Sequence, residues 1–166
     1  ILGRIVPVRL GHDGSCLALA EAWLGATAGS RASMSIVVST GIGGGVVIGG
    51  ELIAGASGNA GHLGQTHVQG ETLTLEEIAS GPASVAWAQS QGWAGTTGEE
   101  LSRDAAEGNE AARAAVVRSA TAVGAALADA VTLLDLEVVA IGGGFSQVSS
   151  DYIDLVQRSL TDTAVL

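Results

Sequence analysis

The chain of 166 residues is long enough for one domain or for a large piece of a two-lobed protein. Hydrophobic residues make up 47% of it and charged residues 14%, which excludes an intrinsically disordered chain, and no uninterrupted apolar run of about 18 residues predicts a membrane-spanning helix. Seventeen acidic residues against seven arginines give a net charge of −10, and such a surface repels nucleic acid and anionic membranes.

The spacing of apolar residues and the positions of Gly and Pro predict alternating strands and helices. In chain order we expect a strand over 5–10, a helix over 15–25, a strand over 34–38, a hairpin with arms 46–48 and 52–53, helices over 75–88 (broken at Gly81-Pro82), 97–106 and 109–134, a strand over 138–141 and a helix over 147–160. Strands that alternate with helices in this way indicate an α/β fold.

Two local features of the first helix can be predicted. Asp13 or Ser15 is a suitable N-cap, because its side-chain oxygen can accept a backbone N–H of the first turn. The single cysteine, Cys16, precludes an intramolecular disulfide. Because Leu17 and Leu19 follow it, a packed thiol is expected in preference to a reactive one.

Two glycine-rich segments follow predicted strands and suggest an anion site. Thr40-Gly41-Ile42-Gly43-Gly44-Gly45 offers free N–H groups and a hydroxyl that can hold phosphate oxygens, although a glycine-rich sheet corner explains it equally well. Gly142-Gly143-Gly144 ends a buried strand, where ligands of open α/β sheets bind, but a tight strand-to-helix turn explains it too.

Asp13 lies between the first strand and helix, where a carboxylate can act as the general base for a hydroxyl. An N-capping role is the simpler alternative. A second polar group lies in the glycine-rich segment 55–65 and the start of the following helix. There His62 and Glu76 could grip sugar hydroxyls, or serve as a structural imidazole and a first-turn helix acid.

In this order the segments resemble the ROK family of repressors and sugar kinases, over residues 6 to about 160. Residues 39–45 resemble the family's phosphate loop, 55–64 with 75–82 its signature region, and 138–145 its late nucleotide-binding turn. The resemblance implies an actin-like, ribonuclease-H-like fold in two lobes. Residues 1–30 would then end the N-terminal lobe and form the interlobe helix, and 31–166 would form most of the C-terminal lobe.

The resemblance also implies an activity, which is the ATP- and Mg²⁺-dependent phosphorylation of a hexose-type sugar. Asp13 falls on the catalytic position, which accepts the proton of the attacking hydroxyl. The implied sugar-binding residues are His12, Asn59, His62, Gln65 and Glu76. The implied ATP-binding residues are Thr40, Gly41, Gly43, Gly44, Gly45, Gly142, Gly143 and Gly144.

Some positions depart from the family pattern. His12 stands where the family usually has Asn. The family's Gly-Glu-x-Gly-His reads Gly61-His62-Leu63-Gly64-Gln65 here, which resembles the bacterial N-acetylmannosamine kinases and removes the zinc-ligating His. Since the family's cysteine-rich segment is also missing before Glu76, we expect no structural zinc or other metal ligand set.

The family's opening Asp-x-Gly-Gly-Thr motif is not present in this sequence, so we expect an incomplete chain that is not a competent kinase by itself. The favoured function is a cytoplasmic kinase of N-acetylmannosamine, a related amino sugar or glucose. The alternatives are the sugar-sensing domain of a ROK transcriptional regulator and a non-catalytic sugar binder. The expected partners are sugar and ATP, with no nucleic acid at this segment, no membrane, and a homodimer as one possibility.

Overall fold

The computed structural model describes residues 11–68 and 70–164, and the strand predicted over 5–10 lies outside them. A four-stranded sheet with the order β3-β2-β1-β4 forms the middle layer. Its strands are β1 (Ala32–Val38), β2 (Ile42–Ile48), β3 (Glu51–Leu52) and β4 (Val138–Gly142). The first three form an antiparallel meander, whereas β4 pairs in parallel with β1, with Ile36 opposite Ile141.

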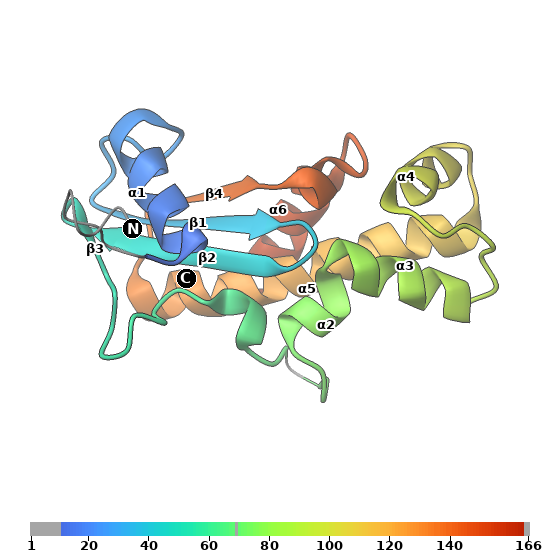
Figure 1. Ribbon diagram of the computed structural model, residues 1–166, viewed down its shortest axis with the longest axis horizontal. Coiled ribbons are helices and arrows are strands. Elements are labelled where there is room, and N and C mark those ends of the chain that lie inside the picture. The colour runs from blue at the N-terminus through green and yellow to red at the C-terminus, as the bar shows by residue number, and fades with distance from the viewer. Residues whose placement is uncertain (1–10, 69, 165–166) are drawn as a thin grey trace, which may run out of the picture.

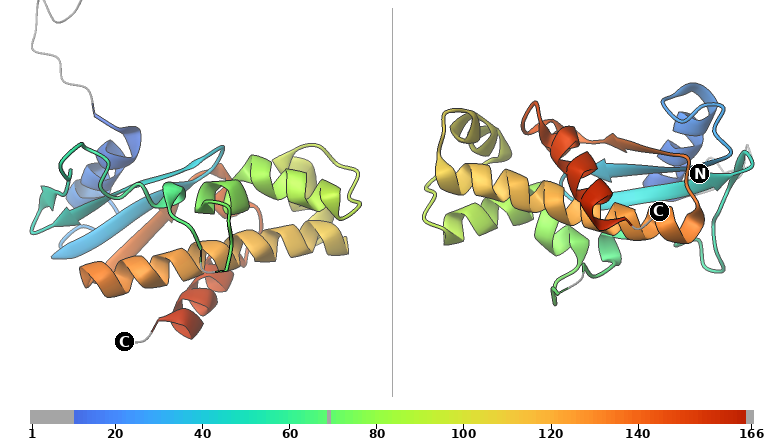
Figure 2. Two further views of the ribbon diagram at one scale, coloured as in Figure 1. Left: turned by 90° about the horizontal axis from the view of Figure 1, so that it is seen from below. Right: turned by 180° about the vertical axis from the view of Figure 1, so that it is seen from behind.

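The helices follow in the predicted order. They are α1 (Asp13–Leu24), α2 (Leu75–Ala79), α3 (Gly81–Ser90), α4 (Gly98–Ala106), α5 (Glu110–Leu134) and α6 (Tyr152–Thr163), with short 3₁₀ turns η2 (Leu63–Gln65) and η3 (Gly144–Gln147). Helix α1 covers one face of the sheet, and α5 and α6 cover the other, so the sheet is sandwiched between helices (Figures 1 and 2). The α/β prediction is therefore confirmed.

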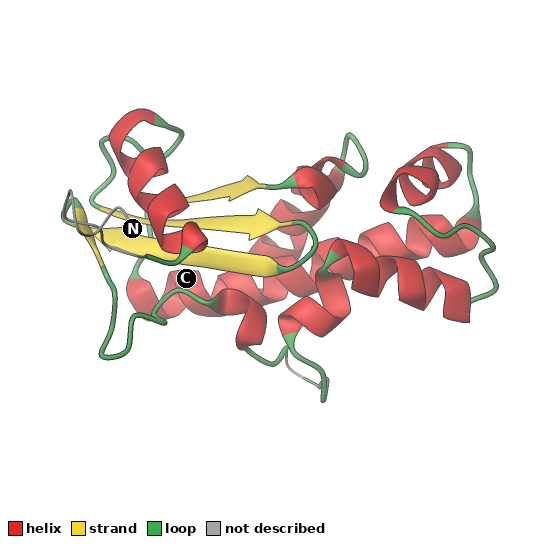
Figure 3. Cartoon of the chain, viewed as in Figure 1, coloured by secondary structure: helices red, strands yellow, loops and turns green. Residues whose placement is uncertain are grey.

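The 25-residue helix α5 is the core of the molecule. It runs below the sheet and continues past its end, where α2, α3 and α4 pack against its N-terminal half (Figure 3). By length and composition α5 could cross a membrane, but 61% of its most apolar window is buried inside the protein. Its Ala-rich faces let neighbouring helices approach closely, which fits a core helix of a globular fold.

Helices α5 and α6 cross at Gly124, which is fully surrounded. A Cβ atom at this position would lie 2.5 Å from the Val156 carbonyl oxygen and 2.6 Å from the Ser159 Cβ. The absence of a side chain therefore sets how closely α6 approaches the core helix.

Several local predictions are confirmed. Residues Gly49 and Gly50 form the hairpin turn with φ of +61° and +81°, which glycine adopts without strain. The break at Gly81-Pro82 separates α2 from α3, because the Ser80 hydroxyl accepts the Ala83 N–H and caps a new helix.

Other local predictions are wrong. Helix α1 begins at Asp13 itself, so neither Asp13 nor Ser15 is its N-cap, and the N-cap residue His12 makes no capping hydrogen bond through its side chain. Cys16 is exposed and not packed, since the buried residues of α1 are Gly14, Ser15 and Ala18. The last helix begins at Tyr152, after the 3₁₀ turn η3, and not near Gln147.

Candidate functional site

The carboxyl ends of β1 and β4 meet because these two strands are parallel neighbours. The loop after β1 and the turn after β4 are therefore brought together, and a Cβ at Gly144 would lie 3.9 Å from the Ser39 hydroxyl oxygen. The start of α3 joins them, because the Gly81 N–H donates to the Ser39 carbonyl at 2.8 Å. Two glycine-rich segments that are 100 residues apart in the sequence thus border one place.

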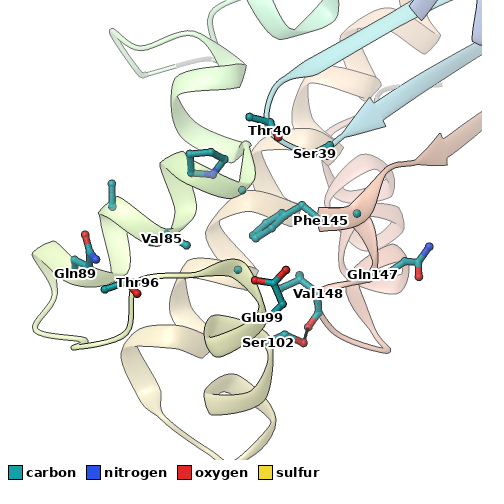
Figure 4. A pocket seen from close by; sticks show the side chains of 15 residues that line it. Ser39, Thr40, Val85, Gln89, Thr96, Glu99, Ser102, Phe145, Gln147 and Val148 are labelled. Atoms are coloured by element: carbon teal, nitrogen blue, oxygen red, sulfur yellow. Dashed lines mark hydrogen bonds between the residues drawn. The ribbon is translucent and has the colours of Figure 1, made fainter.

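A pocket of about 720 Å³ opens at this place, and Figure 4 shows its side chains. One end is formed by Ser39, Thr40 and Gly144, the segments predicted to hold phosphate. The walls come from α3, the start of α4, and η3 with the residue after it. The full lining is Ser39, Thr40, Gly81, Pro82, Val85, Ala86, Gln89, Thr96, Gly98, Glu99, Ser102, Gly144, Phe145, Gln147 and Val148. Its size suits a drug-sized ligand.

No arginine lines this pocket in the described part of the chain, and Glu99 is its only charged lining residue there. Three of the five described arginines, Arg31, Arg103 and Arg113, are instead paired with acids elsewhere. The N-termini of α3 and α4 both border the pocket, so the groups there that could hold an anion are backbone N–H groups and not arginine side chains.

A second group of predicted residues gathers near the start of α1. The imidazole rings of His12 and His62 meet edge to face, with centroids 6.0 Å apart. The Asp13 side chain is exposed, and its Oδ1 accepts the Gly14 N–H at 2.8 Å. The structure therefore brings His62 to His12, which is the residue next to Asp13 in the chain.

Glu76 joins the signature segment to the loop after β1. Its Oε2 accepts the Ile42 N–H at 2.7 Å, and its Oε1 accepts the Gln65 side-chain amide at 3.3 Å. A Cβ at Gly41 would lie 2.6 Å from an oxygen of the same carboxylate, so a side chain at this position would require the Glu76 carboxylate to move. Because Thr40 lines the large pocket, the Glu76 cluster and the pocket share one short loop.

The glycines at 43–45 do not lie in a loop, because β2 already begins at Ile42. Gly44 and Gly45 are buried, and a Cβ at Gly45 would lie 2.9 Å from the Ala18 Cβ of α1. A Cβ at Gly14 would likewise meet the Gly44 backbone at 2.7 Å. These glycines therefore let α1 pack directly on the strand, and they place Asp13 beside it.

The remaining predicted site residues are Asn59 and the glycines at the end of β4 and after it. Asn59 is exposed, and with His62 it lines a smaller pocket of about 350 Å³ against α5, not the large pocket. Gly142 ends β4, and Gly143 follows with φ of +101°, where a Cβ would meet the Val38 carbonyl oxygen.

The sequence analysis did not identify the pocket walls. Glu99 and Gln89 line the large pocket, yet no motif in the sequence singles out either residue. The Thr97 capping box with Glu100 indicates where α4 starts, but no local pattern shows which element this helix faces. Among the described residues, no group of three or more His, Cys, Asp or Glu side chains could hold a metal ion.

Comparison with known proteins shows which family has this arrangement of elements. The model of the ROK family matches residues 4–165, and no curated protein matches. A ROK hexokinase from Thermus thermophilus is 34% identical with a TM-score of 0.88, and the match covers 98% of this chain and 60% of that one. A ROK glucokinase from Streptomyces griseus, solved with glucose and AMPPNP, is 27% identical with a TM-score of 0.85 over 99% and 62%.

Two further solved structures are similar to this chain and are described with other functions. A candidate N-acetylmannosamine kinase from Listeria monocytogenes is 25% identical with a TM-score of 0.81, covering 99% of this chain and 62% of that one. A ROK transcriptional regulator, a homologue of the Escherichia coli MLC protein, shares the fold at 24% identity with a TM-score of 0.83 over 99% and 46%. The chain thus spans about 60% of the length of the kinases it resembles, with their actin-like ATPase fold, and it belongs to the ROK family.

Proposed function

We propose that this chain supplies the nucleotide pocket and part of the sugar site of an ATP-dependent sugar kinase. The observation that carries the proposal is the loop 39–42, which contacts both regions. Thr40 lines the large pocket, and two residues later the Ile42 N–H binds Glu76 of the signature segment. In a phosphoryl transfer, donor and acceptor must be held side by side, so a shared loop between two sites suits this chemistry.

Asp13 is the proposed general base. Its carboxylate is exposed at the start of α1, and the Gly14–Gly44 contact anchors that start on β2. A carboxylate so placed can accept the proton of a sugar hydroxyl as this hydroxyl attacks phosphorus. His12, Asn59, His62, Gln65 and Glu76 are the proposed sugar-contacting residues.

The ATP phosphates are proposed to bind between Thr40, Gly41, Gly81 and Gly144. Two observations fit an anion here: hydroxyl groups of Ser39 and Thr40 at the pocket end, and the N-terminus of α3 with its glycine backbone. Mg²⁺ bound with ATP would supply the charge neutralisation that arginines do not supply in the described pocket lining. Gly43 is proposed to contribute backbone contacts, whereas Gly44 and Gly45 act by positioning α1.

N-acetylmannosamine, a related amino sugar and glucose are the favoured substrates, because His62 resembles the N-acetylmannosamine kinases while a glucokinase is among the similar structures. A regulator domain or a non-catalytic sugar binder is the alternative. Asp13 favours the kinase, because a sensor needs no general base. A cytoplasmic location fits a protein that consumes ATP, and a homodimer is the proposed assembly.

The test is ADP release by the full-length protein with ATP, Mg²⁺ and a panel of N-acetylmannosamine, N-acetylglucosamine and glucose. We expect turnover with at least one sugar, and we expect Asp13→Asn to reduce kcat at least about a hundredfold, as loss of a general base does. Asp162→Asn on the exposed side of α6 changes the same charge and should retain activity.

Sugar binding without turnover would overturn the kinase proposal. Isothermal titration with each sugar distinguishes the outcomes, because a regulator or inactive binder still binds its sugar. Turnover that survives Asp13→Asn would instead overturn the role of Asp13 alone.

A further inference from the structure

Among the described residues, one charged side chain lines the large pocket, and it is the exposed carboxylate of Glu99. Glu99 and Glu100 are neighbours in the first turn of α4, but their roles differ. The Glu100 carboxylate accepts the backbone N–H groups of Thr96 at 2.7 Å and Thr97 at 3.2 Å, which completes the capping box. The Glu99 carboxylate has no hydrogen-bonding partner among the described residues, and it points into the pocket toward Phe145 (Figure 4).

The position of Glu99 within the pocket limits what it can bind. The phosphate-facing end is formed by Ser39, Thr40 and Gly144, whereas Glu99 comes from α4 on the other side of the Phe145 ring. A carboxylate is an acceptor only, so it repels phosphate and requires a ligand group with hydrogen-bond donors. The part of a nucleotide that lies beyond the phosphates is the nucleoside.

We propose that Glu99 binds the ribose of the nucleotide, its two carboxylate oxygens accepting the 2′- and 3′-hydroxyl groups. This inference rests on the proposed function. Two adjacent hydroxyls match two carboxylate oxygens, and acidic side chains bind ribose hydroxyls in the same way in dinucleotide-binding folds. The base then lies against Val85, Ala86 and Val148, apolar side chains that line the same pocket.

Adenine is a poorer match for this carboxylate. Its amino group offers a donor, but the neighbouring ring nitrogen N1 is an acceptor that would face the second carboxylate oxygen. The hydroxyl pair of ribose has no such conflict. Glu99 therefore makes the pocket select ribonucleotides over deoxyribonucleotides.

The test compares nucleotide binding by the full-length wild-type protein, Glu99→Gln and Glu107→Gln, using isothermal titration in the presence of Mg²⁺. Glu107 is exposed at the end of α4 and does not line the pocket. Glu107→Gln therefore removes the same charge as Glu99→Gln, but outside the pocket. The ligands are ATP, 2′-deoxy-ATP, 3′-deoxy-ATP and inosine triphosphate.

We expect the wild type to bind each deoxynucleotide about tenfold more weakly than ATP, the usual effect of losing a charge-assisted hydrogen bond. Glu99→Gln should bind ATP about tenfold more weakly and lose most of this discrimination, whereas Glu107→Gln should behave as the wild type. In turnover assays KM for ATP should rise while kcat at saturating ATP is unchanged.

Three outcomes would overturn the assignment. If Glu99→Gln discriminates ATP from deoxynucleotides as the wild type does, Glu99 does not contact ribose. If the variant changes only the discrimination against inosine triphosphate, the carboxylate binds the base amino group. If the wild type binds no ATP at all, the proposed function itself fails, which distinguishes that failure from the first two.

Discussion

At the scale of single residues, Glu76 has a structural role that can be measured apart from sugar binding. It is half-buried and accepts the N–H of Ile42, the first residue of β2. We expect Glu76→Ala to leave this N–H without its partner and to lower the free energy of unfolding by about 1–3 kcal/mol. Denaturant unfolding measures the change, with the exposed Glu107→Ala as the control. Equal stability of the two variants would show that packing alone holds the start of β2.

Asp151 gives a second residue-scale prediction, which concerns acid stability. The Arg113 guanidinium donates two hydrogen bonds to its carboxylate, at 2.9 and 2.6 Å, and the Ser149 hydroxyl donates a third at 2.9 Å. These bonds hold the pKa of Asp151 well below its ordinary value of 3.8. A depressed pKa means that the unfolded chain binds the proton more readily, so this stabilisation is present above about pH 4 and is lost as the pH falls below it.

We therefore expect Asp151→Asn to lower the free energy of unfolding at neutral pH by about 1 kcal/mol or less, since both side chains are 37% exposed. The difference from the wild type should narrow between about pH 5 and pH 2. Urea unfolding at several pH values measures it. A difference that stays constant across this range would contradict a contribution from the ion pair.

At the scale of elements, the crossing of α5 and α6 depends on Gly124. Alanine normally stabilises a helix relative to glycine, but here its Cβ would meet the backbone of α6. We expect Gly124→Ala to lower the free energy of unfolding by about 1–3 kcal/mol through overpacking. Thermal unfolding tests this, with Gly98→Ala in α4 as the control because a Cβ there meets nothing within 4 Å. A stabilised Gly124→Ala variant would show that α6 can move away at little cost.

The elements also show what the sequence could and could not predict. Apolar spacing and helix signals located α4 and α5 to within about a residue, because caps such as Thr97 and Asn109 are local in sequence. The glycines at 43–45 belong to β2, whereas their sequence is compatible with either a phosphate loop or a glycine-rich sheet corner. Three consecutive glycines have no side-chain pattern, and only the packing of α1 against them shows that they are a strand.

At the scale of the whole molecule, only those parts of the site that consist of recognisable sequence motifs could be predicted. The loop after β1, the turn after β4 and the signature segment are recognisable by their glycines, and the structure brings the first two together at one pocket. The far walls of that pocket come from α3 and α4, which reach it because they pack on the extension of α5 beyond the sheet. Such a wall depends on tertiary packing, so residues such as Glu99 carry no signal in the sequence.

The hydrogen bond between Glu76 and Ile42 has a thermodynamic consequence for the two ligands. Under the proposed function, a sugar that orders Gln65 and Glu76 would also restrain the backbone N–H of Ile42, and hence the loop that ends at Thr40 in the large pocket. We then expect binding at one proposed site to change the affinity at the other. By linkage, the factor by which sugar alters the Kd of nucleotide equals the factor by which nucleotide alters the Kd of sugar. Because the coupling runs through the Glu76 carboxylate, Glu76→Ala should make sugar and nucleotide bind independently.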